Sequence, residues 1–198
     1  MLILKDGSYV TNLPKVLVAI PAYNEEECIE GTILELKRVA PEFDFVVIND
    51  GSRDCTLELC TNLGCNVINM LINCGLTVGF QTAACYALEN DYDYMVQFDA
   101  DGQHRPEYIS ELVSKAQFDN ADIVIGSRFL SMRKDMSMRM FGSRMITFLI
   151  KMLTGKRISD PTSGFRLFNR DVLKEYSCND TLNPEPESIA FFIKQGYK

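Results

Sequence analysis

The feature that most constrains the fold of this chain is a regular alternation of short apolar runs with longer helical segments. The apolar runs are rich in valine and isoleucine, which is typical of buried strands. Strands that alternate with helices of about 10–15 residues form βαβ units, so the pattern predicts a largely parallel sheet covered by helices. The predicted strands are residues 15–22, 43–50, 65–71, 94–99 and 122–127.

Proline and potential capping residues set the expected helix boundaries. Asn24 precedes three glutamates and is expected to cap a helix that ends near Val39, because Pro41 cannot continue it. Pro106 suits the first turn of a later helix. The other predicted helices are residues 54–64, 77–90, 105–117 and 138–155.

Polar clusters follow three of the predicted strands: PAYNEE, NDGSRD and DADGQH. In open sheets of this kind, ligands bind beyond the carboxyl ends of the strands. We therefore expect one site that is built from all three clusters.

Two carboxylates two residues apart, Asp99 and Asp101, end the fourth predicted strand. In an extended segment their side chains lean to the same side, where their charges repel each other. A hard cation such as Mg²⁺ or Mn²⁺ would relieve this repulsion, since Mg²⁺ binds one or two carboxylates and completes its shell with water and phosphate oxygens. Taken alone, the pair is equally compatible with a chance occurrence or a helix cap.

The remaining motif residues are ambiguous when each is taken alone. Asp50 is a potential hydrogen-bond acceptor for a base or ribose, and Gly51 permits close backbone approach. Tyr23 offers a stacking surface, and Glu25 offers an acceptor. Arg166 in DPTSGFR suits either a structural role or an anion site.

The chain of 198 residues has a net charge of −7 that is unevenly distributed. Residues 127–157 contain eight Lys and Arg against one Asp, a net +7, so the rest of the chain carries −14. This distribution argues against nonspecific nucleic-acid binding but favours a localised anion, such as a phosphate or an anionic membrane surface. The helical part of this segment is interpreted either as a surface helix or as an amphipathic helix at a membrane or lipid.

Seven cysteines, an odd number without a C-x-x-C pair, accompany a single histidine. A zinc site is therefore not expected, and the cysteines are interpreted as reduced, small core residues of a cytoplasmic protein. No run of apolar residues is long enough to cross a membrane.

Six motifs together resemble family 2 glycosyltransferases with the GT-A fold. They are IPAYNEE, VVINDGSRD, NCGLTVGFQTA, QFDADGQHRPE, IGSRF and DPTSGFR, in the order and approximate spacing of that family. The resemblance covers residues 16–198 and is strongest to the branch of dolichol-phosphate mannose synthase and bacterial polyprenyl-phosphate glycosyltransferases. It implies a single α/β domain over residues 1–198, a three-layer α/β/α sandwich with a largely parallel mixed sheet.

The resemblance also implies a role for each motif residue. Asp99 and Asp101 are expected to hold Mg²⁺ or Mn²⁺ and, with Ala100, the diphosphate of a UDP- or GDP-sugar. Gln103 and Arg128 are expected at the reaction centre with Asp101. Arg139 matches a second arginine on the acceptor side. The nucleotide pocket is expected to be lined by Pro21, Tyr23, Glu25, Ile48 and Asp50.

The implied reaction is an inverting transfer of the sugar to a polyprenyl phosphate in cell-envelope or polysaccharide synthesis. Such an acceptor is already ionised, so Arg128 and Arg139 would orient it rather than deprotonate it. Residues 127–159 are expected to form the acceptor loop and its amphipathic helix. We expect peripheral attachment at the inner face of the cell membrane, with a separate membrane-anchor protein as a partner.

Other interpretations remain open at this point. A saccharide hydroxyl as acceptor needs a general base, for which Glu107 and Asp160 are candidates, whereas His104 is expected to be structural. A nucleotidyltransferase usually has a glycine-rich phosphate loop, which IPAYNEE lacks. The intact Asp99, Asp101 and Arg166 argue against a noncatalytic nucleotide-sugar-binding or assembly module. Asn49 replaces the first carboxylate of the DDGS motif of the family, which leaves the base preference open. The family continues past Lys198, so we expect the C-terminus to be truncated relative to it.

Overall fold

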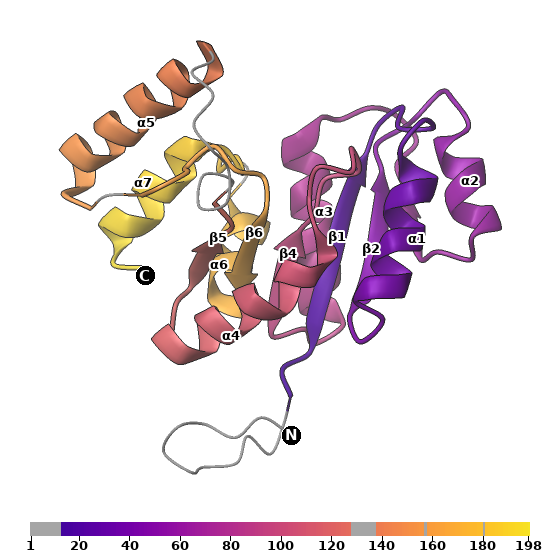
Figure 1. Cartoon of the computed structure of the whole chain (residues 1–198), viewed down its shortest axis with the longest axis horizontal. Coiled ribbons are helices and arrows are strands. Elements are labelled where there is room, and N and C mark those ends of the chain that lie inside the picture. Colours follow the sequence, from indigo (N-terminus) through magenta and orange to yellow (C-terminus); the bar gives the residue numbers. More distant parts are fainter. Residues whose placement is uncertain (1–12, 128–137, 157, 180) are drawn as a thin grey trace.

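The computed structural model describes residues 13–127, 138–156, 158–179 and 181–198, with residues 138–144 described as helical backbone only. Its centre is a six-stranded sheet in the order β3-β2-β1-β4-β6-β5 (Figure 1). The strands are β1 (Val16–Ala22), β2 (Asp44–Asn49), β3 (Val67–Asn69), β4 (Tyr94–Gln97), β5 (Ile123–Ile125) and β6 (Arg166–Asn169).

Helices cover both faces of the sheet. The helices α1, α2 and α4 pack on one face, and α3, α6 and α7 contribute to the core on the other. Helix α5 packs against α7 and lies away from β1 and β2 in Figure 1. The helices are α1 (Ile29–Val39), α2 (Thr56–Asn62), α3 (Leu76–Glu89), the 3₁₀ turn η1 (Pro106–Tyr108), α4 (Ile109–Asp119), α5 (Met138–Thr154), α6 (Arg170–Cys178) and α7 (Pro186–Gln195).

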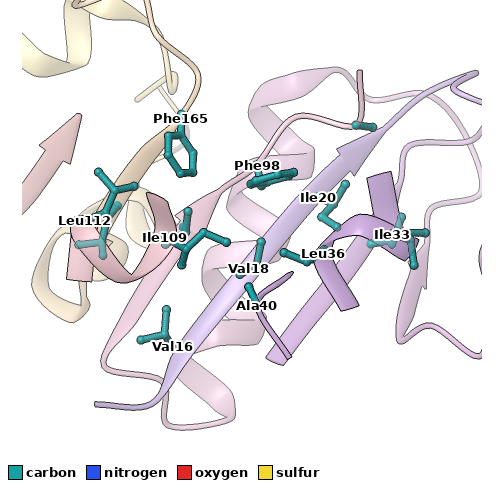
Figure 2. Close-up of a cluster of buried hydrophobic side chains, with 14 of the residues drawn as sticks. Val16, Val18, Ile20, Ile33, Leu36, Ala40, Phe98, Ile109, Leu112 and Phe165 are labelled. Atoms are coloured by element: carbon teal, nitrogen blue, oxygen red, sulfur yellow. The ribbon is translucent and has the colours of Figure 1, made fainter. Parts of the chain in front are cut away.

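Strand β1 explains the layered arrangement because its side chains alternate between two cores. Val18 and Ile20 pack with Ile33 of α1, in the cluster that Figure 2 shows. Leu17 and Ala19 point the other way and pack with the residues of α3 and α6. A strand that is buried on both faces needs a helical layer on each side. The predicted three-layer α/β/α sandwich is therefore confirmed.

Strand direction decides where the motifs meet. Strands β1, β2, β3 and β4 are parallel, whereas β6 is antiparallel to both β4 and β5. The polar clusters after β1, β2 and β4 therefore lie at the same edge as the segment after β5. The DPTSGFR motif reaches this edge because it precedes a strand that runs in the opposite direction. The mixed, largely parallel sheet was predicted, but β6, α6 and α7 were not.

Two local predictions were wrong. Asn24 does not cap α1, which begins at Ile29; its φ of 55° places it in a left-handed turn. Most of the cysteines are not core residues: Cys60 is buried, but Cys28, Cys55, Cys74 and Cys178 are exposed.

Helix α5 carries several large apolar side chains on its surface. Met145, Phe148 and Met152 are 56%, 64% and 65% exposed. They are three and four residues apart and therefore share one face of the helix. Across the described part of the chain, no helix is both long and apolar enough to cross a membrane.

Candidate active site

The loops after β1 and β2 are fastened to each other by hydrogen bonds that involve side chains. The Asn24 amide donates to Ser52 Oγ at 3.0 Å, and the Arg53 amide donates to Asn24 Oδ1 at 2.9 Å. The Glu25 amide donates to Thr56 Oγ1 at 2.8 Å. The Asn24 side chain therefore caps a loop rather than a helix, and PAYNEE and NDGSRD form one structural unit.

Asp50 holds a further loop against this unit. Its two carboxylate oxygens accept the amides of Cys74 and Gly75 at 2.7 and 2.8 Å. At Gly51, with φ at 66°, a β-carbon would lie 2.5 Å from the Ile72 carbonyl carbon, so a side chain at this position would collide with the loop backbone. Asp50 thus shapes the end of β2, and its contact with a nucleotide stays a prediction.

Asp99 is oriented by the single histidine of the chain. The Asp99 amide donates to His104 Nδ1 at 2.9 Å, so the proton of the neutral imidazole is on Nε2. That Nε2 lies 3.3 Å from Asp99 Oδ2. The imidazole is 8% exposed and packs near Phe98 and Phe165, with ring centroids 5.4 and 5.1 Å away. These contacts favour the structural role that was expected for His104.

Asp101 is exposed and lies in a turn rather than in an extended strand. Strand β4 ends at Gln97, and Asp101 Oδ1 accepts the amide of Gln103 at 2.9 Å. The prediction assumed an extended segment in which both side chains lean to the same side, and this assumption was therefore wrong. The charges of Asp99 and Asp101 nevertheless both affect Glu25. Partial burial raises the pKa of Glu25, and the negative charges of Asp101, Asp54 and Asp99 raise it further.

The residues present fit a hard divalent cation. Asp99 and Asp101 would provide oxygen ligands, and the negative charges of both raise the pKa of Glu25. Within the described ranges, no group of three His, Cys, Asp or Glu side chains could hold a metal ion. A cation at this position would therefore need oxygens from water and from the phosphates of a substrate, as is usual for Mg²⁺.

The other residues expected in the nucleotide pocket differ in their accessibility. Tyr23 is 42% exposed, and Pro21 is half-buried in β1. The side chains of Ile48 and Ala100 are buried in the two cores, so a contact of their side chains with a nucleotide is not favoured, and their role stays a prediction. The Ala100 carbonyl also accepts a 2.8 Å hydrogen bond from Thr32 Oγ1 on α1.

The residues expected at the reaction centre are only partly placed. Gln103 is exposed and lies two residues after Asp101. Arg128 and most of the predicted acceptor loop lie outside the described residues, and Arg139 is described only as part of the backbone of α5. The roles of all three stay predictions.

Arg166 has a structural role. It is 3% exposed and donates to the carbonyls of Pro161, Ser163 and Pro184 at 2.8, 2.7 and 3.0 Å. Burial lowers the pKa of its guanidinium. Of the two interpretations of this arginine, the geometry favours the structural one, because the guanidinium ties the DPTSGFR loop to the segment before α7.

A cavity of about 640 Å³ opens between α5, the start of α7 and the end of β4, and we call it the α5–α7 cavity. Gln97 and Asp99 line its end near the sheet, and Glu185 and Glu187 line it from the start of α7. Apolar side chains of α5, among them Leu149, form the opposite wall. Asp99 therefore lies between the loops of β1 and β2 on one side and this cavity on the other.

Sequence reasoning missed Gln97, Gly164 and the two glutamates of this cavity. The signal for Gln97 was a polar residue inside the apolar run YMVQFD. A β-carbon on Gly164 would lie 2.4 Å from Asp99 Oδ2, which is a contact between distant segments that no local pattern indicates. Glu185 and Glu187 face the site only because α7 packs against α5.

Comparisons with known proteins agree with this geometry. The family model described as glycosyl transferase family 2 matches residues 17–177. The chain is 29% identical to a polyprenol monophosphomannose synthase of Mycolicibacterium smegmatis, over 86% of this chain and 68% of that protein. It is 30% identical to an undecaprenyl-phosphate mannosyltransferase of Micrococcus luteus, over 81% of this chain and 68% of that protein.

Solved structures support the fold independently of sequence. Glucosyl-3-phosphoglycerate synthase from Mycobacterium tuberculosis, in complex with Mn²⁺, UDP-glucose and phosphoglyceric acid, superimposes with a TM-score of 0.64 at 20% identity. The match covers 80% of this chain, which spans 57% of the length of that protein. The order of the motifs, the three-layer sheet and these matches lead to one conclusion: the chain belongs to glycosyl transferase family 2 and has the GT-A fold of a glycosyltransferase.

Proposed function

We propose that this chain transfers a sugar from a UDP- or GDP-sugar to a polyprenyl phosphate with inversion at the anomeric carbon. The observation that carries the proposal is that Asp99 lines the α5–α7 cavity at the edge where the parallel strands end, two residues before the exposed Asp101. Relatives named for transfer to polyprenol and undecaprenyl phosphate support the choice of acceptor.

On the donor side, Asp99 and Asp101 would hold Mg²⁺ or Mn²⁺ against the diphosphate of the donor. The cation supplies positive charge where the leaving nucleoside diphosphate becomes more negative. His104 contacts the Asp99 carboxylate through Nε2, and Asp101 is exposed. Tyr23 and the connected loops after β1 and β2 would receive the nucleoside.

On the acceptor side, helix α5 fits a lipid substrate at a membrane surface. Its face with Phe148 and Met152 is exposed, and residues 127–157 carry a net +7. A phosphate headgroup needs orientation rather than deprotonation, a role for which we propose Arg128 and Arg139. We also propose that the protein acts at the inner face of the cell membrane and that a separate membrane protein anchors it.

Substitution of Asp101 tests the donor site directly. Asp101→Asn removes one ligand charge, and we expect at least a tenfold weaker binding of UDP or GDP in the presence of Mn²⁺. Calorimetric titration with and without EDTA measures the metal-dependent part. Asp171→Asn is the matched control, because Asp171 is an exposed carboxylate that pairs with Lys174 on α6. Unchanged metal-dependent binding in Asp101→Asn would contradict the metal assignment.

A second candidate function is transfer to a saccharide hydroxyl, which the carboxylates of the cavity favour. Glu185 and Glu187 lie in the same cavity as Asp99, where a general base would be needed. The two expected candidates fit less well, since Glu107 pairs with Arg105 at the surface and Asp160 is 1% exposed. Mass spectrometry of the product distinguishes a glycosyl phosphate from an O-glycoside.

A further inference from the structure

Gln97 is the last residue of β4 and lines the α5–α7 cavity. It pairs with Ala19 of β1 on one side and with Arg166 of β6 on the other. The residue is 4% exposed, and its Oε1 has no hydrogen-bond partner among the residues that the structure describes. Buried polar side chains are almost always hydrogen-bonded, so an unpartnered carboxamide beside a cavity indicates a group that a ligand satisfies.

The neighbouring charges limit what this ligand group can be. Asp99, Glu185 and Glu187 bring negative charge and hydrogen-bond acceptors to the cavity. Among the lining residues that the structure describes, Arg166 is the one cation, and it already donates to three backbone carbonyls. An anion such as a phosphate is therefore disfavoured beside Gln97, whereas an uncharged group that donates hydrogen bonds is favoured.

The opposite wall of the cavity points to a ring with an apolar face. Ile146, Leu149 and Leu153 of α5 line this wall. A sugar ring presents hydroxyls along its edge and C–H groups on its faces, so it matches a cavity with both kinds of wall. A hydroxyl both donates and accepts, so it can pair with either end of the carboxamide, whose terminal torsion is roughly two-fold.

We propose that Gln97 is a specificity-determining residue that hydrogen-bonds a hydroxyl of the transferred sugar. This inference rests on the proposed function, since it places the donor sugar in the α5–α7 cavity beside Asp99. In this arrangement, different residues recognise the sugar and the nucleoside diphosphate. The cation ligands hold the diphosphate, and Gln97 distinguishes between sugars.

The test substitutes Gln97→Met, which keeps a similar shape and removes the carboxamide. Binding of UDP, GDP, UDP-glucose, UDP-N-acetylglucosamine and GDP-mannose with Mn²⁺ is measured by calorimetry. We expect the affinity of the preferred nucleotide-sugar to fall about tenfold, which corresponds to about 1.4 kcal/mol, with the affinity of the free nucleoside diphosphate unchanged. The midpoint of thermal unfolding should stay the same or rise, because an unsatisfied buried acceptor is removed.

Monodeoxy donors identify the hydroxyl. In the wild type, removal of one particular hydroxyl should weaken binding about tenfold, and in Gln97→Met the same removal should have no further effect. Gln81→Leu is the control, because Gln81 on α3 donates to the Asn179 carbonyl outside the cavity. Its substitution should not change the discrimination between sugars.

The outcomes separate this inference from the function on which it rests. Equal loss of nucleoside diphosphate and nucleotide-sugar binding in Gln97→Met, or a lower unfolding midpoint, would show that Gln97 is structural. Unchanged sugar affinity would show that its carboxamide recognises no ligand. If the wild type binds none of the five compounds, the proposed function itself fails, and the assignment of Gln97 fails with it.

Discussion

At the residue scale, the orientation of Asp99 depends on its contacts with His104 and Gly164. The backbone amide of Asp99 and its carboxylate both contact the His104 ring, which two phenylalanines hold in place. On the other side the carboxylate packs against Gly164, where a β-carbon would lie 2.4 Å from Oδ2. Catalytic groups need such support, since small displacements of a ligand weaken a metal site considerably.

Gly164→Ala should therefore weaken the donor site without a change in any charged residue. The added methyl group forces the Asp99 carboxylate or the DPTSGFR loop to move, and such overpacking costs about 1–3 kcal/mol. We expect metal-dependent UDP or GDP binding to weaken about tenfold or more, measured by calorimetry. Gly31→Ala is the control, since Gly31 lies in α1 with no atom near its β-carbon position, and it should stabilise the helix by about 0.5–1 kcal/mol. Wild-type binding in Gly164→Ala would contradict the proposal that Gly164 keeps the Asp99 carboxylate in its binding position.

At the element scale, the reversed direction of β6 brings the DPTSGFR loop to the same edge as the strand-end clusters. The loop precedes β6, and Arg166 ties it to the Pro184 carbonyl just before α7. One buried guanidinium thus connects the edge of the sheet, the DPTSGFR loop and the wall of the α5–α7 cavity. Among the described hydrogen bonds, no other cationic side chain donates to these three carbonyls.

Arg166→Lys tests this structural role, because lysine keeps the charge but lacks the planar fork that reaches three acceptors. Buried carbonyls left without a donor cost about 1–3 kcal/mol, so we expect a loss of about that size in the free energy of unfolding. Urea denaturation measures it. Arg105→Lys, at an exposed pair with Glu107, should change stability by less than about 0.5 kcal/mol. Equal stability of the Arg166→Lys variant and the wild type would contradict the structural assignment.

The sequence predicts well those elements in which the spacing of apolar residues reflects the burial of one or both faces. Strand β1 and helices α1 and α3 are buried along whole faces, and their apolar patterns reflect this. Strand β6 was missed because its four residues, RLFN, contain no β-branched residue, and its antiparallel direction depends on the path of the chain. Asn24 was misassigned because its contacts with Ser52 and Arg53 prevail over its local capping preference.

The candidate site, like the fold, has one part that the sequence indicates and one part that it does not. Asp99 and Asp101 were predicted because two carboxylates two residues apart after an apolar run are a local signal, and their role stays a prediction. Gln97, Gly164 and Glu185 were missed because their part in the site depends on which helix or loop packs against them. Local motifs indicate the carboxylates expected to bind the donor. The α5–α7 cavity, in contrast, forms only when α5 and α7 pack together.

At the scale of the whole molecule, charge and apolar surface coincide on one segment. Residues 127–157 carry +7, whereas the rest of the chain carries −14. An anionic membrane would attract this segment and repel the remainder, so the charge distribution favours one orientation at a surface. The exposed apolar face of α5 belongs to the same segment, and its burial in the membrane interface would add to this attraction.

Vesicle binding tests this orientation. The double substitution Phe148→Ser and Met152→Ser removes two exposed apolar side chains from α5 and should weaken binding to anionic phospholipid vesicles about tenfold or more. Co-sedimentation at increasing salt should show weaker binding of the wild type, since salt screens the attraction of the basic segment. Phe118→Ser is the matched control, because Phe118 on α4 is 73% exposed and lies outside the basic segment. If the double variant binds vesicles as well as the wild type, or the control loses as much binding as the double variant, the proposed orientation through α5 is contradicted. Unchanged UDP or GDP binding in all variants ensures that the comparison concerns the membrane surface alone.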